Sequence, residues 1–600
     1  MNLNISYLIE SYKNNSLTPL KVIEDILQRR EEFNDQKIWI RPLTLTEIQP
    51  YLDNIKDKNI DDMPLYGIPF AIKDNIDLAG IPTTAACPAF EKTPEKSAFV
   101  VQQLINAGAI PIGKTNMDQF ATGLVGTRSP EPWGECKNSF NKEYISGGSS
   151  SGSAVSVALG LASFSLGTDT AGSGRVPASF NNLVGLKPSI GLLSMTGVLP
   201  ACRSLDCVSI FALTTDDANK VLEQAAIYDA EDQYARKIPF DNNIRQYGFP
   251  EKSFSFAVPK PEQLAFFGNS SAQKLFEDSV KKMETLGGEK QEIDFSIFAQ
   301  AAKLLYEGPW VAERYVAIEK LITEQPEALL PVINTIIGGA ANKSAIDAFK
   351  AEYKMQVYRA KAKQILSMFD FLMTPTTGTI YTIDEVNADP IKLNSNLGFY
   401  TNFMNLLDCS CVAVPAGFID NDLPWGISLV STAMSDRKLL SYANMWQQDN
   451  KLMPGNLGLP LAATNADTIS YSSTIPVIVC GAHMQGLALN WQLTERGGKF
   501  VEKTKSAKAY RMFVIEGTIK RPGMIRDDSA GSEIDIEIWQ VPKSEFGSFV
   551  AAIPEPLGIG KVETEDGRWL PGFICEGYAI ENTQEVTQLG GWRSYIEKTQ

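Results

Sequence analysis

Histidine is almost absent from this sequence: among 600 residues there is one, His483. A serine hydrolase of the Ser–His–Asp type would have to recruit that single residue from the C-terminal region. The eight cysteines are scattered, and only Cys409 and Cys411 stand close together, without the second pair or the histidines that complete a zinc site. We therefore expect reduced thiols, and we expect neither a metal nor an organic cofactor.

Positive charge is also in deficit, because 70 acidic residues outnumber 55 basic ones and leave a net charge of −15. Nucleic acids are bound by basic stripes, so no nucleic-acid partner is expected. The sequence has no apolar run of about 18 residues, which a membrane-spanning helix requires. Its first residues lack the charged and apolar regions of a signal peptide. These absences predict a cytoplasmic protein with no membrane association.

The chain is longer than one ordinary domain, and the pattern of its residues changes along the sequence. Residues 1–455 alternate short apolar runs with glycine-rich turns and helical segments, a pattern typical of a mixed α/β core. Residues 456–473 are rich in Gly, Pro, Asn, Ala and Ser and are predicted to be a linker. Residues 474–600 contain short β-type runs separated by turns, so we expect a smaller β-rich domain there.

Two further predictions concern elements within the first domain. Thr18 and Pro19 suit the cap and the first position of a helix whose apolar stripe includes Val22 and Ile26. Residues from about 215 to 370 are predicted to be mostly helical.

Three polar residues between positions 73 and 173 lie in segments rich in glycine or apolar residues. They are Lys73 in GIPFAIKDN, Ser149 in SGGSSSGSAV and Ser173 in LGTDTAGSGRVPAS. A serine nucleophile without histidine needs another base, and a buried lysine, whose pKa falls, can supply one. Small residues before Ser173 allow backbone amides to converge on an oxyanion. The predicted donors are the amides of Thr170, Ala171, Gly172 and Ser173.

With these motifs the sequence resembles the amidase signature family, over most of residues 60–215 and weakly on to about 445. The resemblance implies a Ser–Ser–Lys centre in which Lys73 is the base, Ser149 the bridging serine and Ser173 the nucleophile. It also implies a cis peptide bond before Ser149 and a mixed central β-sheet surrounded by helices. One departure is visible, because the family usually has glycine where Ser151 stands.

Substrate choice is predicted from Tyr306 and Arg314, which lie either side of a helix break at Gly308-Pro309. Arginine suits bidentate binding of a carboxylate, although from the residues alone a surface ion pair and core packing remain the simpler roles. The segments YEGPWVAER, PACRSLDCVSIFA and VCGAHMQGLALNWQL resemble the allophanate hydrolase branch of the family. That resemblance implies that Tyr306 and Arg314 hold a small carboxylated urea, and that residues 115–123, including Gly123, line the pocket.

The tail resembles the second domain of that branch, which has a γ-glutamyl-cyclotransferase-like β fold. By this resemblance the chain hydrolyses the terminal amide of allophanate, and its tail promotes breakdown of the product, N-carboxycarbamate, in urea degradation. His483 matches the histidine implicated in the second step, although a structural role for it stays open. The branch implies a homodimer that works with a biotin-dependent urea carboxylase. The sequence has no biotin-type or ATP-grasp motif, so the carboxylase is expected to be a separate protein.

Two alternatives remain open. The first is an amidase of other specificity, such as the glutamine-handling subunit of an aminoacyl-tRNA amidotransferase. The second gives the tail no catalytic role and makes it a module for binding or assembly.

Overall fold

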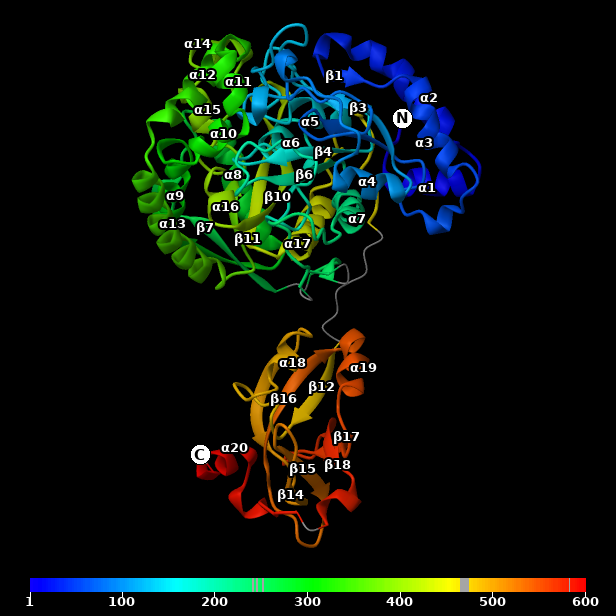
Figure 1. Cartoon of the computed structure of the whole chain (residues 1–600), viewed down its shortest axis with the longest axis vertical. Coiled ribbons are helices and arrows are strands. Elements are labelled where there is room, and N and C mark those ends of the chain that lie inside the picture. The colour runs from blue at the N-terminus through cyan, green and yellow to red at the C-terminus, as the bar shows by residue number, and fades with distance from the viewer. Residues whose placement is uncertain (240–241, 244–245, 251–252, 465–473, 582, 600) are drawn as a thin grey trace. The chain divides into compact units, whose positions relative to one another are not determined.

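The computed structural model describes residues 1–600 except 240–241, 244–245, 251–252, 465–473, 582 and 600. Two compact units divide the chain (Figure 1). The first comprises Met1–Ile238 with Asn242–Thr468, and the second contains the described residues from 474 onward. Half of the predicted linker, 465–473, lies outside the described residues, so the linker stays a prediction.

A mixed sheet of eleven strands forms the centre of the first unit, as far as the structure describes it. The strands lie in the order β1-β3-β2-β4-β6-β5-β10-β11-β9-β7-β8. Their bounds are β1 (Trp39–Pro42), β2 (Pro69–Lys73), β3 (Ile110–Thr115), β4 (Phe164–Asp169), β5 (Val184–Lys187), β6 (Cys207–Ala212), β7 (Phe254–Pro259), β8 (Gly288–Ile293), β9 (Phe371–Pro375), β10 (Cys409–Ile419) and β11 (Leu423–Thr432).

Helices surround this sheet (Figure 1). Their bounds are α1 (Ile5–Lys13), α2 (Pro19–Arg30), α3 (Leu45–Ile55), α4 (Phe99–Asn106), α5 (Ser151–Ala158), α6 (Val176–Phe180), α7 (Thr215–Ala225), α8 (Ser270–Thr285), α9 (Ser296–Glu307), α10 (Val311–Ala317), α11 (Glu319–Glu324), α12 (Pro331–Gly338), α13 (Ala345–Leu366), α14 (Ile383–Ala388), α15 (Lys392–Leu397), α16 (Phe403–Leu406) and α17 (Asp436–Asn450). The predicted mixed central sheet with surrounding helices is confirmed.

Local sequence explains where α2 begins. The Thr18 side chain accepts a hydrogen bond from the Lys21 amide, and Pro19 occupies the first turn, where its missing N–H costs nothing. Val22 and Ile26 are buried against the core. The predicted helix start is therefore confirmed.

The prediction of a mostly helical stretch from 215 to 370 missed two strands, β7 and β8. β7 pairs in parallel with β9 and with β8, and so extends the sheet to its edge. β8 has the sequence GEKQEI and is largely exposed, because a strand at an edge need not bury either face. Its polar composition hides the apolar alternation by which strands are recognised.

The second unit is β-rich, as predicted. A five-stranded sheet in the order β13-β16-β12-β18-β17 lies with a two-stranded pair, β14-β15. The bounds are β12 (Thr474–Val479), β13 (Lys499–Lys505), β14 (Tyr510–Ile515), β15 (Arg521–Arg526), β16 (Asp535–Pro542), β17 (Leu557–Glu563), β18 (Trp569–Cys575), α18 (Trp491–Thr494), α19 (Lys543–Ala551) and α20 (Trp592–Thr599). The alternating residues Val477, Val479, Ile536 and Ile538 are buried in a core that is separate from that of the first unit.

None of the helices in the described part of the chain combines the length and the apolar character needed to cross a membrane. The eight cysteines are all buried as free thiols.

Candidate active site

Two neighbouring parallel strands bring the predicted site residues to one edge of the sheet. β2 pairs with β4 in parallel, with Ile72 opposite Leu166. Lys73 is the last residue of β2, and Ser173 follows the end of β4 after a short turn. Because the carboxyl ends of parallel strands meet at the same edge, residues far apart in the sequence lie together there.

Lys73, Ser149 and Ser173 form a continuous chain of polar contacts. The Lys73 Nζ atom lies 2.8 Å from Ser149 Oγ, which lies 3.0 Å from Ser173 Oγ. Lys73 and Ser149 are fully buried, and Ser173 is 2% exposed. The sequence predicted these residues, and their geometry allows a proton to pass from Ser173 through Ser149 to Lys73.

The surroundings of Lys73 favour its neutral form. Burial lowers the pKa of Lys73 from 10.5 to about 7, although the carboxylates of Asp118, Asp206 and Asp169 oppose the shift. Lys73 Nζ also lies 2.8 Å from Thr168 Oγ1, which accepts a further hydrogen bond from the Asn75 side chain. A neutral amine near pH 7 is what a general base requires. Sequence reasoning did not identify Thr168, because its contact with Lys73 joins two neighbouring strands, β4 and β2, that are far apart in the sequence.

A glycine-rich loop shapes the approach to Ser149. The peptide bond between Gly148 and Ser149 is cis, as the family resemblance implied. A Cβ atom on Gly148 would lie 2.1 Å from Asp118 Oδ2, so no larger residue fits there. Asp118 is buried and accepts backbone hydrogen bonds from Gly126 and Arg128. The glycine therefore allows the serine loop to pack directly against a buried carboxylate.

The turn that carries Ser173 is held by a buried ion pair that sequence reasoning missed. The Arg175 Nη2 atom lies 2.8 Å from Asp169 Oδ1, and both side chains are fully buried. Asp169 also accepts hydrogen bonds from the amides of Gly172 and Gly174. Burial would raise the pKa of Asp169, but Arg175 holds it below its usual value. The signal for this pair was available, since both residues lie within the predicted nucleophile motif, on either side of Ser173.

This turn bears on the predicted oxyanion donors. The Gly172 amide donates to Asp169 Oδ1 at 3.0 Å, so it is already engaged. The amides of Thr170, Ala171 and Ser173 donate to no group among the described residues. Gly172 has φ +137°, and a Cβ atom there would lie 2.5 Å from Thr401 Oγ1, so glycine is required. The three amides of Thr170, Ala171 and Ser173 are thus the better donors of the four that the sequence suggested.

Asp206 supports the same turn from the opposite side. Its carboxylate accepts hydrogen bonds from the Thr170 hydroxyl and from the amides of Ala201 and Cys202. Burial raises the pKa of Asp206 to about 6. The residue lies within a segment that carried the family resemblance, but its contacts depend on the tertiary fold, and sequence reasoning gave it no role.

Arg314 and Tyr306 face one another across the predicted helix break. α9 ends at Glu307, α10 begins at Val311, and the Arg314 Cζ atom lies 5.7 Å from the centre of the Tyr306 ring. Arg314 is 2% exposed, and its Nη1 donates to Ala121 O and Thr122 Oγ1. Its Nη2 has no partner in the part of the chain that the structure describes. A buried guanidinium with a free N–H group is suited to a carboxylate ligand.

Gly123 lies next to the residues that contact Arg314. It has φ +150°, and a Cβ atom there would lie 2.6 Å from Asp118 Oδ2 and 3.0 Å from Arg128 Nη1. The positive charge of Arg314 also lowers the pKa of Lys73, which places the two groups within electrostatic reach. The structure thus brings the segment 115–123 and Arg314 together in one region, near Lys73.

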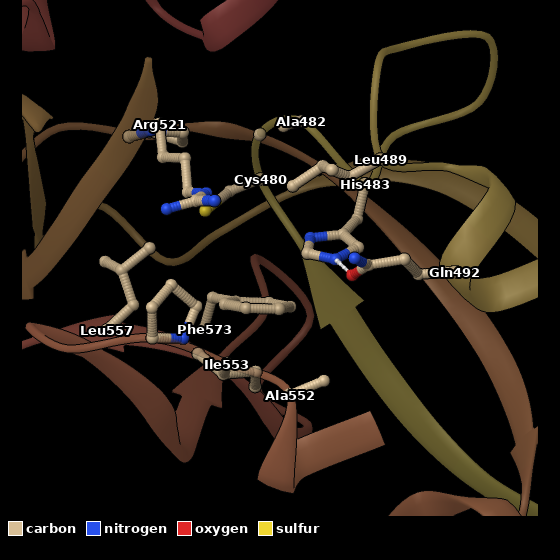
Figure 2. A pocket seen from close by; sticks show the side chains of 13 residues that line it. Cys480, Ala482, His483, Leu489, Gln492, Arg521, Ala552, Ile553, Leu557 and Phe573 are labelled. Atoms are coloured by element: carbon tan, nitrogen blue, oxygen red, sulfur yellow. Dashed lines mark hydrogen bonds between the residues drawn. The ribbon is translucent and has the colours of Figure 1, made fainter. Parts of the chain in front are cut away.

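His483 belongs to the second unit and forms a separate site, shown in Figure 2. Its Nε2 atom lies 2.8 Å from Gln492 Oε1, and its ring stacks on Phe573 with centres 4.9 Å apart. Burial lowers the pKa of His483, so the imidazole is neutral near pH 7. It lines a pocket with Arg521 and Cys480, neither of which sequence reasoning identified.

Across the described ranges no group of three or more histidine, cysteine or acidic side chains is placed to hold a metal ion.

Two family models match the sequence. The Amidase model matches residues 21–440, and the model described as the allophanate hydrolase C-terminal domain matches residues 475–597.

Named relatives match along most of the chain. A urea amidolyase of Saccharomyces cerevisiae is 42% identical over 607 residues, which cover 97% of this chain and 32% of the relative. The chain therefore spans about a third of the length of that curated relative. The structure of a Kluyveromyces lactis allophanate hydrolase is 39% identical, covers 98% of each chain and superposes with a TM-score of 0.74.

A second type of relative matches about two thirds of the chain. A glutamyl-tRNA(Gln) amidotransferase subunit from Carboxydothermus hydrogenoformans is 30% identical over 424 residues, which cover 65% of this chain and 85% of the relative.

Proposed function

The chain belongs to the amidase family, and on that premise we propose that it hydrolyses the terminal amide of allophanate, the carboxylated form of urea. The second unit would then promote breakdown of the product, N-carboxycarbamate, to ammonia and carbon dioxide. The observation that carries the proposal is the buried Arg314, whose Nη2 has no partner among the described residues, near the Ser173–Ser149–Lys73 chain. A family match over both units supports it.

Acylation begins with proton transfer. Ser173 passes its proton to Ser149, which passes its own to neutral Lys73, while Ser173 Oγ attacks the carbonyl carbon of the terminal amide. The amides of Thr170, Ala171 and Ser173 donate to the oxygen that becomes negative. The C–N bond then breaks, the relay returns a proton to nitrogen, and ammonia leaves.

Deacylation uses the same groups, with water in place of Ser173 as the nucleophile that gives up a proton. Water gives a proton to the Ser149–Lys73 relay and attacks the acyl carbon, and the Ser173 oxygen recovers a proton as it leaves. The product is N-carboxycarbamate. No step needs a metal or an organic cofactor.

Specificity follows from Arg314 and Tyr306. A guanidinium that is buried without a carboxylate leaves a charged donor unsatisfied, which costs free energy that only a carboxylated substrate recovers. Allophanate places a carboxylate two bonds from the amide that is cleaved, so one small pocket accommodates both groups.

The second step is assigned to the pocket of His483. Breaking one C–N bond of N-carboxycarbamate releases carbon dioxide and leaves the electron pair on nitrogen, which takes up a proton. His483 moves that proton, and the carbamate that remains takes up another to give ammonia and a second carbon dioxide. The total yield is two ammonia and two carbon dioxide for each allophanate, the second half of urea degradation.

The wider assignment includes a homodimer in the cytoplasm that receives allophanate from a biotin-dependent urea carboxylase. The likeness to proteins named urea amidolyases supports coupling to urea metabolism, and those relatives are about three times as long as this chain. The expectation that the carboxylase is a separate protein stays a prediction.

The amidotransferase alternative rests on relatives that resemble the first unit. Those relatives match about two thirds of this chain, and a separate family model, that of the allophanate hydrolase C-terminal domain, matches residues 475–597. Ammonia release from glutamine and not from allophanate would favour this alternative.

Paired substrates test the role of Arg314. Biuret has the same shape as allophanate but carries an amide in place of the carboxylate. We expect Arg314→Gln to lower kcat/KM for allophanate by about 10- to 100-fold or more, and to change hydrolysis of biuret far less. An equal loss for both substrates would show that Arg314 supports the fold and does not bind the carboxylate. Arg236→Gln, at a partly exposed ion pair with Asp408, is the control.

A further inference from the structure

Arg521, the first residue of β15, differs from the other arginines of the second unit. Arg511, Arg526, Arg568 and Arg593 each form an ion pair with a carboxylate, and Arg496 donates hydrogen bonds to Gln492 O and Ser548 Oγ. Arg521 forms no ion pair among the described residues, and its buried Nε atom has no hydrogen-bond partner there. An arginine without a counter-charge that lines a pocket is a candidate for binding an anion from solution.

The pocket walls that the structure describes supply nothing to neutralise Arg521. Thirteen residues line the pocket, and none of them carries a carboxylate. Apolar side chains, among them Phe573, Leu557 and Ile553, make up part of the pocket walls, as Figure 2 shows. A guanidinium in such walls strengthens its hold on an anion because little water competes for it.

His483 is held in place on the same pocket. Gln492 engages its Nε2 atom, and the Phe573 and Phe549 rings pack against the imidazole. Nδ1 is therefore the ring nitrogen that remains for a ligand. Arg521 lies close enough to His483 to act on it electrostatically, and so does Arg496, which donates to Gln492 O and to Ser548 Oγ.

We propose that Arg521 binds a carboxylate of a small dicarboxylate and holds it against His483, so that this pocket takes the N-carboxycarbamate made by the first unit. The inference rests on the proposed function for the identity of the natural ligand. It deepens that function by naming the group that recognises the ligand. Binding of a dicarboxylate at His483 can nevertheless be measured without any turnover in the first unit.

The sole histidine of the sequence makes the test direct. In full-length protein labelled in histidine, every imidazole signal in a magnetic resonance spectrum comes from His483. Malonate, a stable mimic of N-carboxycarbamate with CH₂ in place of NH, is the probe. We expect malonate to shift the His483 signals and to raise the imidazole pKa, since it brings negative charge beside a ring whose pKa is lowered by burial and by two arginines.

Variants identify the residue responsible. Arg521→Gln is expected to weaken malonate binding about 10- to 100-fold and to raise the pKa of His483 in the free protein, because a nearby positive charge is lost. Arg521→Lys keeps the charge and is expected to retain part of the affinity. Arg568→Gln removes an exposed arginine of the same unit and is expected to bind malonate as the unaltered protein does.

The outcomes are distinguishable. An unshifted His483 signal at saturating malonate, or equal malonate affinity in Arg521→Gln and Arg568→Gln, would overturn the inference. Unchanged His483 ring signals in free Arg521→Lys would show that the pocket is still folded. If malonate binds as expected but allophanate yields no ammonia, the proposed function fails while the anion site stands.

Discussion

At the scale of single residues, the protonation of Lys73 controls the proposed chemistry. The amine acts as a base only when neutral, and burial sets its pKa at about 7. We therefore expect kcat/KM for allophanate to rise with pH through a limb centred near 7 and to level off above it. A pH–rate profile between 5.5 and 9 measures this, at about half-unit steps. A limb near the ordinary lysine value would mean that Lys73 is not the base.

Asp206 gives a second test at this scale. Its negative charge raises the pKa of Lys73, so Asp206→Asn is expected to move the limb to lower pH, by up to about one unit. The maximum rate is also expected to fall, because Asp206 accepts the Thr170 hydroxyl beside the nucleophile. Asp408→Asn, at a surface ion pair, is the control and should leave the limb in place.

The nucleophile itself is tested by a pair of serines. Ser173→Ala is expected to lower ammonia release from allophanate by about three orders of magnitude or more, since it removes the hydroxyl that the Ser149–Lys73 relay contacts. Ser151→Ala is the matched control, because its hydroxyl donates to Asn116 O at 3.3 Å and lies outside the relay. Thermal unfolding of both variants shows whether the fold is retained. Comparable activity in the two variants would contradict the assignment of Ser173.

At the scale of elements, the turn between β4 and α6 depends on the ion pair of Asp169 and Arg175. Arg175→Met leaves a buried carboxylate without its partner, which costs about 3–5 kcal/mol. We expect a marked fall in the thermal midpoint of the first unit and a loss of activity, because Asp169 also holds the Gly172 amide. Arg236→Gln breaks a partly exposed pair at the same 2.8 Å separation, for which about 0–1 kcal/mol is typical, and is the control. Similar midpoints for both variants would show that the buried pair contributes little.

The same elements show what a sequence can and cannot predict. The mixed α/β core of the first unit followed from the alternation of short apolar runs with glycine-rich turns, and the segments around Lys73, Ser149 and Ser173 indicated the candidate catalytic residues. The supporting contacts did not follow, because the Arg175 guanidinium donates to Thr401 O and Asn405 Oδ1 from α16 and its flank, more than two hundred residues away. Such partners are fixed by tertiary packing and leave no local pattern.

The edge strand β8 and the pocket residue Arg521 could not be predicted from the sequence either, because their character depends on tertiary packing. β8 reads as polar because it lies at the edge of the sheet, where neither face must be buried. Arg521 has no feature in the sequence that separates it from the paired arginines around it. Its lack of a counter-charge becomes visible only when its neighbours are placed in space.

At the scale of the whole molecule, the two units should contribute separate steps. His483→Ala is expected to leave release of the first ammonia unchanged and to slow release of the second toward the rate of breakdown in solution, since general acid–base catalysis contributes about 10²–10⁴-fold. Time courses of ammonia and carbon dioxide from allophanate separate the two phases. An unchanged second phase would favour a structural role for the second unit, and Arg568→Gln serves as the control.

The central claim is that the Ser173 site cleaves an amide next to a carboxylate held by Arg314. The most direct measurement is the initial rate of ammonia release by the purified protein from allophanate, beside malonamate and glutamine. The account predicts fast release from allophanate and little from glutamine, whose longer chain does not place its carboxylate at Arg314. Release from glutamine alone, or from all three amides alike, would contradict the substrate assignment and the role given to the second unit.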